Sequence, residues 1–148
     1  MKIIRATRKH LKDWVDLRFK LWPRHVKLGL RREALRILNN PKEPVFLVLN
    51  DLEKPVGFAE FTTRSYVDGC TSKPVGFLDG IYIAPEYRRK GLAEKLVKTG
   101  ERWAAGQGCK EFGSDTEIDN KKSIAFHKAI GFRITDRQVV FIKKINRR

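Results

Sequence analysis

A strand–turn–helix segment at residues 77–93 has the residue types of an anion-binding site. It reads FLDGIYIAPEYRRKGLA, an apolar strand followed by a basic turn and an amphipathic helix. Where a helix begins, its first amides have no partner within the helix, and the helix dipole favours negative charge. Arg88, Arg89 and Lys90 add positive charge, and Gly91 lets the backbone approach a phosphate. These residues predict a pyrophosphate cradle; an ordinary turn with solvated basic side chains is the alternative.

Other phosphate and metal motifs are absent from the sequence. It contains neither GxxxxGK[ST] nor GxGxxG, which argues against a Walker loop and a dinucleotide fingerprint. The two cysteines, Cys70 and Cys109, form no CxxC pair, and the chain has three histidines. The sequence therefore predicts no metal site, and thiols that stay reduced in the cytoplasm.

Apolar and polar periodicity predicts alternating strands and helices along the chain. Strands are expected at residues 2–6, 45–49, 56–64, 75–83, 109–114, 132–135 and 139–143. Helices are expected between Thr7 and Pro23, at about 30–39, from Leu92 to Gly106 and from about Asn120 to Ile130. The order β-α-α-β-β-β-α-β-α-β-β predicts an α/β fold with a mixed central sheet flanked by helices on both faces.

Length and charge limit the possible functions. The chain has 148 residues, enough for a single domain over 1–148, and no apolar run near the ~20 residues of a membrane span. The net charge is +15. It lies at the two ends, with +9 in residues 1–40 and +8 in 121–148, while 41–80 carries −2. Solvated helix faces explain such charge runs; an anionic cofactor or a nucleic acid is the alternative.

Two motifs carry a resemblance to a known family. Arg88-x-x-Gly91-x-Ala93 resembles the acetyl-coenzyme A signature (Q/R)xxGx(G/A) of the GNAT N-acetyltransferase superfamily. Downstream, Asn120-x-x-Ser123-x-x-Phe126-His127-x-x-x-Gly131-Phe132 is similar to the superfamily's NxxAxxxYxxxGF motif. The resemblance covers essentially the whole chain. It implies a GNAT-like, mostly antiparallel sheet and acetyl-CoA as cosubstrate.

Several further blocks resemble the aminoglycoside 6′-N-acetyltransferases within that superfamily. They are Leu21-Trp22-Pro23, Tyr66 to Cys70, Asp79 to Arg88, Gly108-Cys109, Ser114-Asp115-Thr116 and Phe126 to Phe132. This resemblance implies transfer of an acetyl group from acetyl-CoA to the 6′-amine of an aminoglycoside, and thus antibiotic resistance. It also implies a homodimer.

The superfamily resemblance places the cosubstrate on two stretches of the chain and on the later motif. The implied cofactor-binding residues are Ile81, Ile83, Arg88, Arg89, Lys90, Gly91, Leu92, Ala93, Asn120, Ser123 and His127. Gly80 is expected to be a bulge or splay point of the strand, and close packing is the alternative. The splay would present an amide N–H, from Tyr82 or a neighbour, to the thioester oxygen.

For the acceptor, the resemblance implies roles for Trp22, Tyr66, Asp79, Asp115 and Asp136. A polycationic aminoglycoside needs carboxylates and aromatic walls. Asp115 or Asp79 would accept the ammonium proton, directly or through water, although a free carboxylate is a weak base. Core packing is the alternative for Trp22 and Tyr66, and a turn or surface position for the two aspartates.

His127 stands where the superfamily often has a tyrosine general acid. A histidine can protonate a departing thiolate near neutral pH; packing beneath the cofactor is the alternative. Asn120 either contacts the pantetheine arm or caps its helix, and both roles can hold together.

Two other functions remain open from the sequence. A GNAT enzyme could acetylate a protein N-terminus, a lysine side chain or a polyamine. A basic nucleic-acid-binding domain is the alternative of another class. The sequence argues against nucleic acid, because the aromatic residues are not interleaved with Lys and Arg and no helix-turn-helix or RNP pattern is present.

Overall fold

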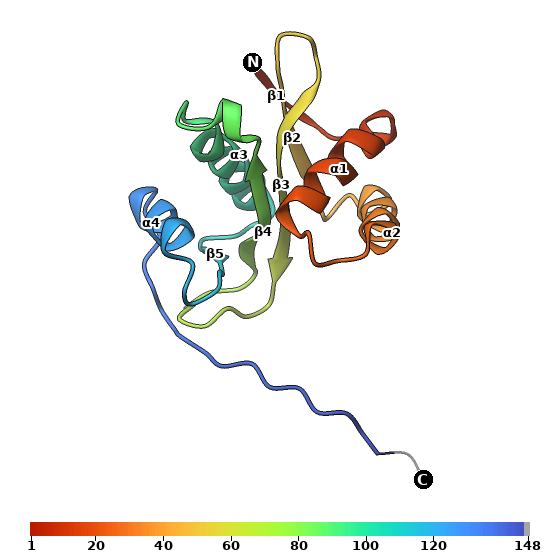
Figure 1. The fold of residues 1–148 in the computed structure, drawn as a ribbon. Coiled ribbons are helices and arrows are strands. Elements are labelled where there is room, and N and C mark those ends of the chain that lie inside the picture. The colour runs from red at the N-terminus through yellow and green to blue at the C-terminus, as the bar shows by residue number, and fades with distance from the viewer. Residues whose placement is uncertain (147–148) are drawn as a thin grey trace. The chain divides into compact units, whose positions relative to one another are not determined.

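The computed structural model describes residues 1–146 and contains one five-stranded sheet. The strands are β1 (Lys2–Arg5), β2 (Val45–Leu49), β3 (Pro55–Arg64), β4 (Val75–Ile83) and β5 (Phe112–Ser114). They lie side by side in chain order; β1 to β4 are antiparallel, and β5 runs parallel to β4 (Figure 1). The predicted mixed, mostly antiparallel sheet is confirmed.

Helices cover both faces of this sheet, as predicted (Figure 1). A 3₁₀ turn (Arg8–His10) leads into α1 (Leu11–Leu21), which packs beside α2 (Lys27–Leu38) on one face. A second 3₁₀ turn (Pro85–Tyr87) precedes α3 (Leu92–Gly106) on the other face. The first helix ends where expected, because Pro23 excludes the preceding residue from helical geometry.

The core has one half on each face of the sheet. Trp14 of α1, Phe58 of β3 and Leu47 of β2 are fully buried on the first face. Phe61 of β3 is buried on the other face, where its ring lies over Gly100 of α3. Side chains of β3 therefore alternate between the two helical layers, as the period of a strand requires.

β4 bulges at Asp79. Glu60 of β3 pairs with Gly80, but the next residue, Phe61, pairs with Leu78, so Asp79 is the extra residue. Gly80 follows the bulge, and a Cβ there would stand 2.7 Å from the ring of Trp22. The bulge therefore lies at Asp79, one residue before the predicted position, whereas Gly80 stays paired with Glu60 and is closely packed against Trp22. The bulge re-aims the side chains of β4 within the sheet.

The contacts divide the chain into two units, Met1–Asp115 and a second beginning at Thr116. The second unit contains α4 (Lys121–Ala129). The Asn120 side chain caps this helix by accepting the Ser123 amide at 3.1 Å. Gly131 follows the helix with φ +103°, a left-handed conformation that suits glycine.

The two strands predicted at 132–135 and 139–143 are not found, and no strand is present among residues 116–146. That expectation is wrong for a single copy of the chain. A strand needs a neighbour for its N–H and C=O groups, and here the side chains of Val139, Val140 and Phe141 are 75%, 86% and 88% exposed. β5 is also shorter than predicted. Within residues 1–146, no helix is long and apolar enough to cross a membrane.

Candidate active site

The second half of β4 has an open edge. β3 pairs with β4 over its whole length, whereas β5 pairs only with Gly76, Phe77 and Leu78 and ends at Ser114. From Asp79 to Ile83, the edge on the β5 side is therefore not paired with any strand of residues 1–115. An extended ligand that carries amide groups can bind such an edge as an added strand.

Amides along β4 alternate between the paired and the open edge. Ala84 donates its N–H to the Val56 carbonyl beside β3 at 2.8 Å, so Tyr82, two residues earlier, points its amide the same way. The amides of Ile81 and Ile83 then point to the open edge. Of the expected oxyanion donors, Tyr82 or a neighbour, this alternation favours the neighbours.

Arg88 ties the basic turn to the end of β4. Its Nε donates to the Ile83 carbonyl at 2.7 Å, and its guanidinium lies 5.3 Å from the centre of the Tyr82 ring. The side chain thus closes the far end of the open edge. The Arg88 amide donates to the Pro85 carbonyl at 3.2 Å, so any contribution of Arg88 to anion binding comes from its charge.

The start of α3 presents unpaired amides. Gly91 is the N-cap with φ +76°, and the first helical bond runs from the Lys95 amide to the Gly91 carbonyl at 3.1 Å. The amides of Leu92 and Ala93 therefore have no partner within the helix. A Cβ on Gly91 would meet no atom within 4 Å, so the space in front of the helix is open.

Two cations stand beside these amides. Arg89 and Lys90 are exposed, Arg89 has φ +63°, and the Lys90 Nζ lies 5.6 Å from the centre of the Tyr87 ring. The donor set of amides and cations fits a diphosphate. The side chain of Leu92, by contrast, is buried in the core, so this residue can contribute only its backbone.

Asp79, the bulge residue, is a partly buried carboxylate with two partners. Thr62 donates its hydroxyl to Oδ2 at 2.7 Å, and Arg64 Nη2 donates to Oδ1 at 3.1 Å. Burial raises the pKa of Asp79 above its ordinary value, against the opposing effect of the Thr62 and Arg64 bonds. The carboxylate is thus held in a fixed orientation and titrates at higher pH than an exposed aspartate.

Asp79 also lines a cavity of about 200 Å³ between α1, α2 and the sheet. Its charged lining residues are Arg18, Glu33, Arg36, Glu43, Glu60 and Asp79. Four carboxylates against two guanidiniums make this lining acidic, although the chain as a whole carries +15. Trp22, which follows α1, supplies an aromatic wall and lies edge-on to Phe58 at 6.2 Å between ring centres.

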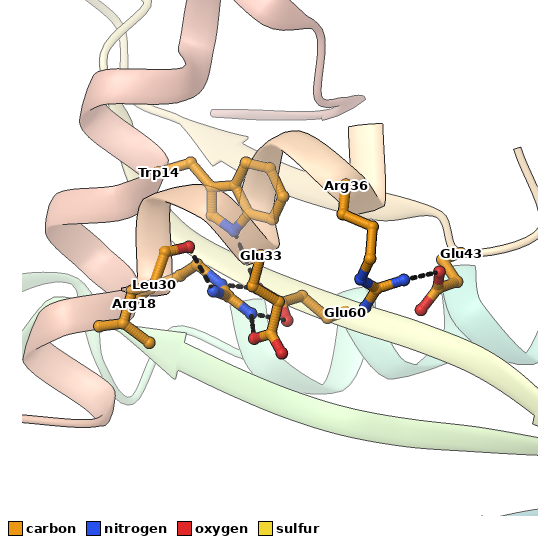
Figure 2. Close-up of polar contacts among 7 residues, drawn as sticks. All are labelled: Trp14, Arg18, Leu30, Glu33, Arg36, Glu43 and Glu60. Carbon is orange, nitrogen blue, oxygen red and sulfur yellow. Dashed lines mark hydrogen bonds and ion pairs between the residues drawn. The ribbon is translucent and has the colours of Figure 1, made fainter. Parts of the chain in front are cut away.

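Two lining residues, Arg18 and Glu60, form a buried ion pair that no sequence motif predicted (Figure 2). The Arg18 and Glu60 side chains are 1% and 7% exposed, and Arg18 Nε donates to Glu60 Oε2 at 2.7 Å. Arg18 Nη2 also donates to Glu60 Oε1, and Trp14 Nε1 to Oε2, both at 3.0 Å. Because both oxygens only accept, Glu60 is a carboxylate here. One signal existed: Glu60 is the lone charge in the apolar run VGFAEF.

Burial and pairing act against each other on this ion pair. Burial raises the pKa of Glu60, and the bonds from Arg18 and Trp14 lower it in part. For Arg18, burial lowers the pKa, but the bonds to Glu60 and Glu33 outweigh burial and raise it. Arg18 is therefore a permanent cation inside the fold.

The register brings Asp115 to the same region as Asp79. Leu78 pairs with Ser114, so Asp79 and Asp115 are the next residues of two parallel strands, where their pairing stops. Asp115 is exposed. Tyr66 lies in the loop between β3 and β4 and is 64% exposed, which excludes core packing for this residue.

Four predicted residues belong to the second unit. Asn120 caps α4 through Ser123, as one of its two predicted roles requires. His127 Nδ1 lies 2.7 Å from the Ser123 carbonyl, so Nδ1 carries the proton. Its Nε2 can then deliver a proton only from the doubly protonated ring. Asp136 is exposed in a segment without helix or strand.

No group of three or more His, Cys, Asp or Glu side chains within residues 1–146 could hold a metal ion. The open strand edge and the amides before α3 fit an extended ligand that bears phosphate groups, such as the cosubstrate of an acyltransferase.

Comparisons with known proteins agree with this class. The model of the acetyltransferase (GNAT) family matches residues 10–132. An aminoglycoside N(6′)-acetyltransferase type 1 of Acinetobacter genomosp. 13 is 40% identical over 146 residues, which span 98% of this chain and 99% of the relative. A Salmonella typhimurium protein of the same name is 38% identical over 145 residues, or 97% and 99% of the two chains.

Solved structures of similar proteins superimpose closely. Aminoglycoside 6′-N-acetyltransferase AAC(6′)-IG of Acinetobacter haemolyticus matches with a TM-score of 0.92 and 38% identity, over 99% of this chain and all of that one. AAC(6′)-Iy in complex with the bisubstrate analogue CoA-S-monomethyl-acetylneamine matches with a TM-score of 0.90 and 35% identity, over 97% and 98%. The chain belongs to the GNAT acetyltransferase family.

Proposed function

We propose that this protein transfers the acetyl group of acetyl-CoA to the 6′-amine of an aminoglycoside. The names of its full-length relatives support this activity. The observation that carries it is the acidic cavity, with Asp79 and Trp22 in its lining, beside the open edge of β4. Local carboxylates can attract a polycation to a +15 chain, because charges separated by more than ~8 Å are largely screened at physiological salt.

The cosubstrate fits the open edge and the turn before α3. Its diphosphate would bind the amides from Arg89 to Ala93, with Arg88, Arg89 and Lys90 supplying charge, and its pantetheine arm would pair with Ile81 and Ile83. The Arg88 amide, which the resemblance also implied, already donates to the Pro85 carbonyl. Acetyl-CoA supplies the thioester that the amine attacks. The free amides of Ile81 or Ile83 would stabilise the negative charge that develops on the thioester oxygen.

Carboxylates position the amine in this proposal. Asp79 and Asp115, at the ends of the paired stretch of β4 and β5, hold the ammonium group and accept its proton directly or through water. Trp22 and Tyr66 supply aromatic contact, and Asp136 adds a further carboxylate. Asn120 and Ser123 assist the pantetheine arm, and a doubly protonated His127 protonates the departing thiolate.

We further infer a cytoplasmic homodimer that acts as one domain over its whole length. The family match extends across the boundary at residue 115 into the second unit, which supports one domain. Cys70 and Cys109 are unpaired, in keeping with a reducing compartment. The exposed run at 139–142 needs a strand partner, and a second copy of this chain offers an identical segment.

Thiol release from acetyl-CoA tests this proposal. The assay compares neamine with spermidine and with a lysine-containing peptide, and we expect turnover with neamine. Turnover with the peptide or spermidine alone would overturn the aminoglycoside assignment. Asp115→Ala should lose neamine turnover about tenfold or more while calorimetry finds acetyl-CoA affinity nearly unchanged. Asp51→Ala, in the exposed turn between β2 and β3, is the matched control.

A further inference from the structure

Arg18 connects three elements that form the acceptor cavity (Figure 2). From α1 it donates to both oxygens of Glu60 in β3, to the Leu30 carbonyl at 2.8 Å, and to the Glu33 carboxylate. Leu30 and Glu33 both belong to α2. One guanidinium therefore fixes the spacing between the helical pair and the strand that faces it.

The same guanidinium supports the aromatic wall. Its central carbon lies 5.0 Å from the centre of the Trp22 ring, and that ring rests on Gly80 beside the bulge. Glu60 pairs directly with Gly80 across the sheet. Trp22 thus lies against both the Arg18 guanidinium, which Glu60 orients, and the backbone of β4 at Gly80.

Stability alone does not account for such an ion pair. Removing two charges from water is expensive, and apolar replacements of buried pairs are often neutral or stabilising. At this site, the planar fork of arginine meets Glu60 with two parallel bonds, reaches α2 and stacks near Trp22. A lysine keeps the charge but has no such fork.

We propose that Arg18, oriented by Glu60, is a positioning residue for the acceptor: it holds Trp22 and α2 at the distance from Asp79 that an aminoglycoside requires. This inference rests on the proposed function. It predicts that Arg18 affects binding of the acceptor and leaves binding of the cosubstrate unchanged. The guanidinium bonds to Glu60, Leu30 and Glu33, and these three residues lie outside both the open edge of β4 and the turn before α3.

The first test compares Arg18→Lys with Arg31→Lys, a matched change on the exposed face of α2. Steady-state kinetics with neamine and acetyl-CoA give KM and kcat for each. For Arg18→Lys we expect the KM for neamine to rise about tenfold or more, and the KM for acetyl-CoA to stay within about twofold. Arg31→Lys should match the unaltered protein. An equal rise of both KM values in Arg18→Lys would overturn the inference.

A second variant separates positioning from folding. Arg18→Met combined with Glu60→Gln removes both charges and leaves the Trp14 N–H an acceptor, so it should melt at higher temperature than Arg18→Met alone. We expect its KM for neamine to remain raised. Recovery of both the melting temperature and that KM would show a merely structural pair and overturn the inference. If the unaltered protein releases no thiol with neamine, the proposed function and this inference both fail.

Discussion

Asp79 is the residue at which fold and chemistry meet, since it is the bulge of β4 and a lining residue of the acidic cavity. Its pKa is raised by burial. As pH falls, Asp79 should become protonated at a higher pH than an exposed aspartate, whose pKa is about 3.9. The protonated form loses its attraction for an ammonium group, so neamine affinity should fall with falling pH.

Calorimetry of neamine binding across this acid range measures the effect. Asp79→Asn should bind about tenfold more weakly at neutral pH, the worth of one charge-assisted hydrogen bond, and lose most of the acid dependence. Asp51→Asn controls for removal of one exposed carboxylate. An unchanged pH dependence in Asp79→Asn would assign the titration to another group.

Single functional residues were predictable from the sequence only where a short motif contained them. Gly91 stands in a short motif, and α3 begins directly after it, as predicted. Arg18 and Glu60 are 42 residues apart, and neither is part of a motif. Their pairing follows from how α1 crosses β3, which periodicity does not specify.

At the scale of elements, the turn before α3 carries the next prediction. Gly91→Val places a β-branched side chain at φ +76°, a strained conformation that should shift the turn. Its Cβ meets no atom of the fold, so the protein should still fold. We expect acetyl-CoA affinity to fall about tenfold or more by calorimetry, with neamine affinity retained.

Gly108→Val is the matched control, since Gly108 also has a left-handed φ, +89°, and its Cβ position is equally open. It should bind acetyl-CoA as the unaltered protein does. Normal acetyl-CoA affinity in Gly91→Val would remove the diphosphate from this turn.

Most elements were predictable from periodicity, and the exceptions have physical causes. α2 begins at Lys27, three residues earlier than predicted, because its N-cap is Val26 and provides no side-chain signal. The segment at 139–143 has a strand-like pattern, but the pattern states only that a strand would be favourable. It does not state which chain supplies the neighbour.

At the scale of the whole molecule, the exposed apolar run at 139–142 leads to a prediction on assembly. Phe141→Glu adds a charge to the surface that we assign to a second copy. The unaltered protein should have twice the 17.2 kDa mass of one chain by light scattering, and Phe141→Glu should approach 17.2 kDa. Phe141→Leu, which preserves an apolar surface, should remain a dimer. A monomeric unaltered protein would contradict this assignment.

Charge is distributed in keeping with two ligands of opposite sign. The turn before α3 is basic, whereas the cavity between α1, α2 and the sheet has an acidic lining. Composition alone gives only the sum of +15, which left an anionic cofactor or a nucleic acid as alternatives to solvated helix faces. The placement of carboxylates around Asp79 required the fold.

Because β5 ends at Ser114, the second half of β4 has an unpaired edge within residues 1–115, and this edge affects the tendency of the protein to aggregate. Unpaired strand edges can pair with the edges of other chains, and aggregation often begins in this way. If the pantetheine arm of acetyl-CoA binds the open edge of β4, the cosubstrate also prevents that edge from pairing with other chains. Protein freed of acetyl-CoA should therefore aggregate at a lower protein concentration than protein that holds it.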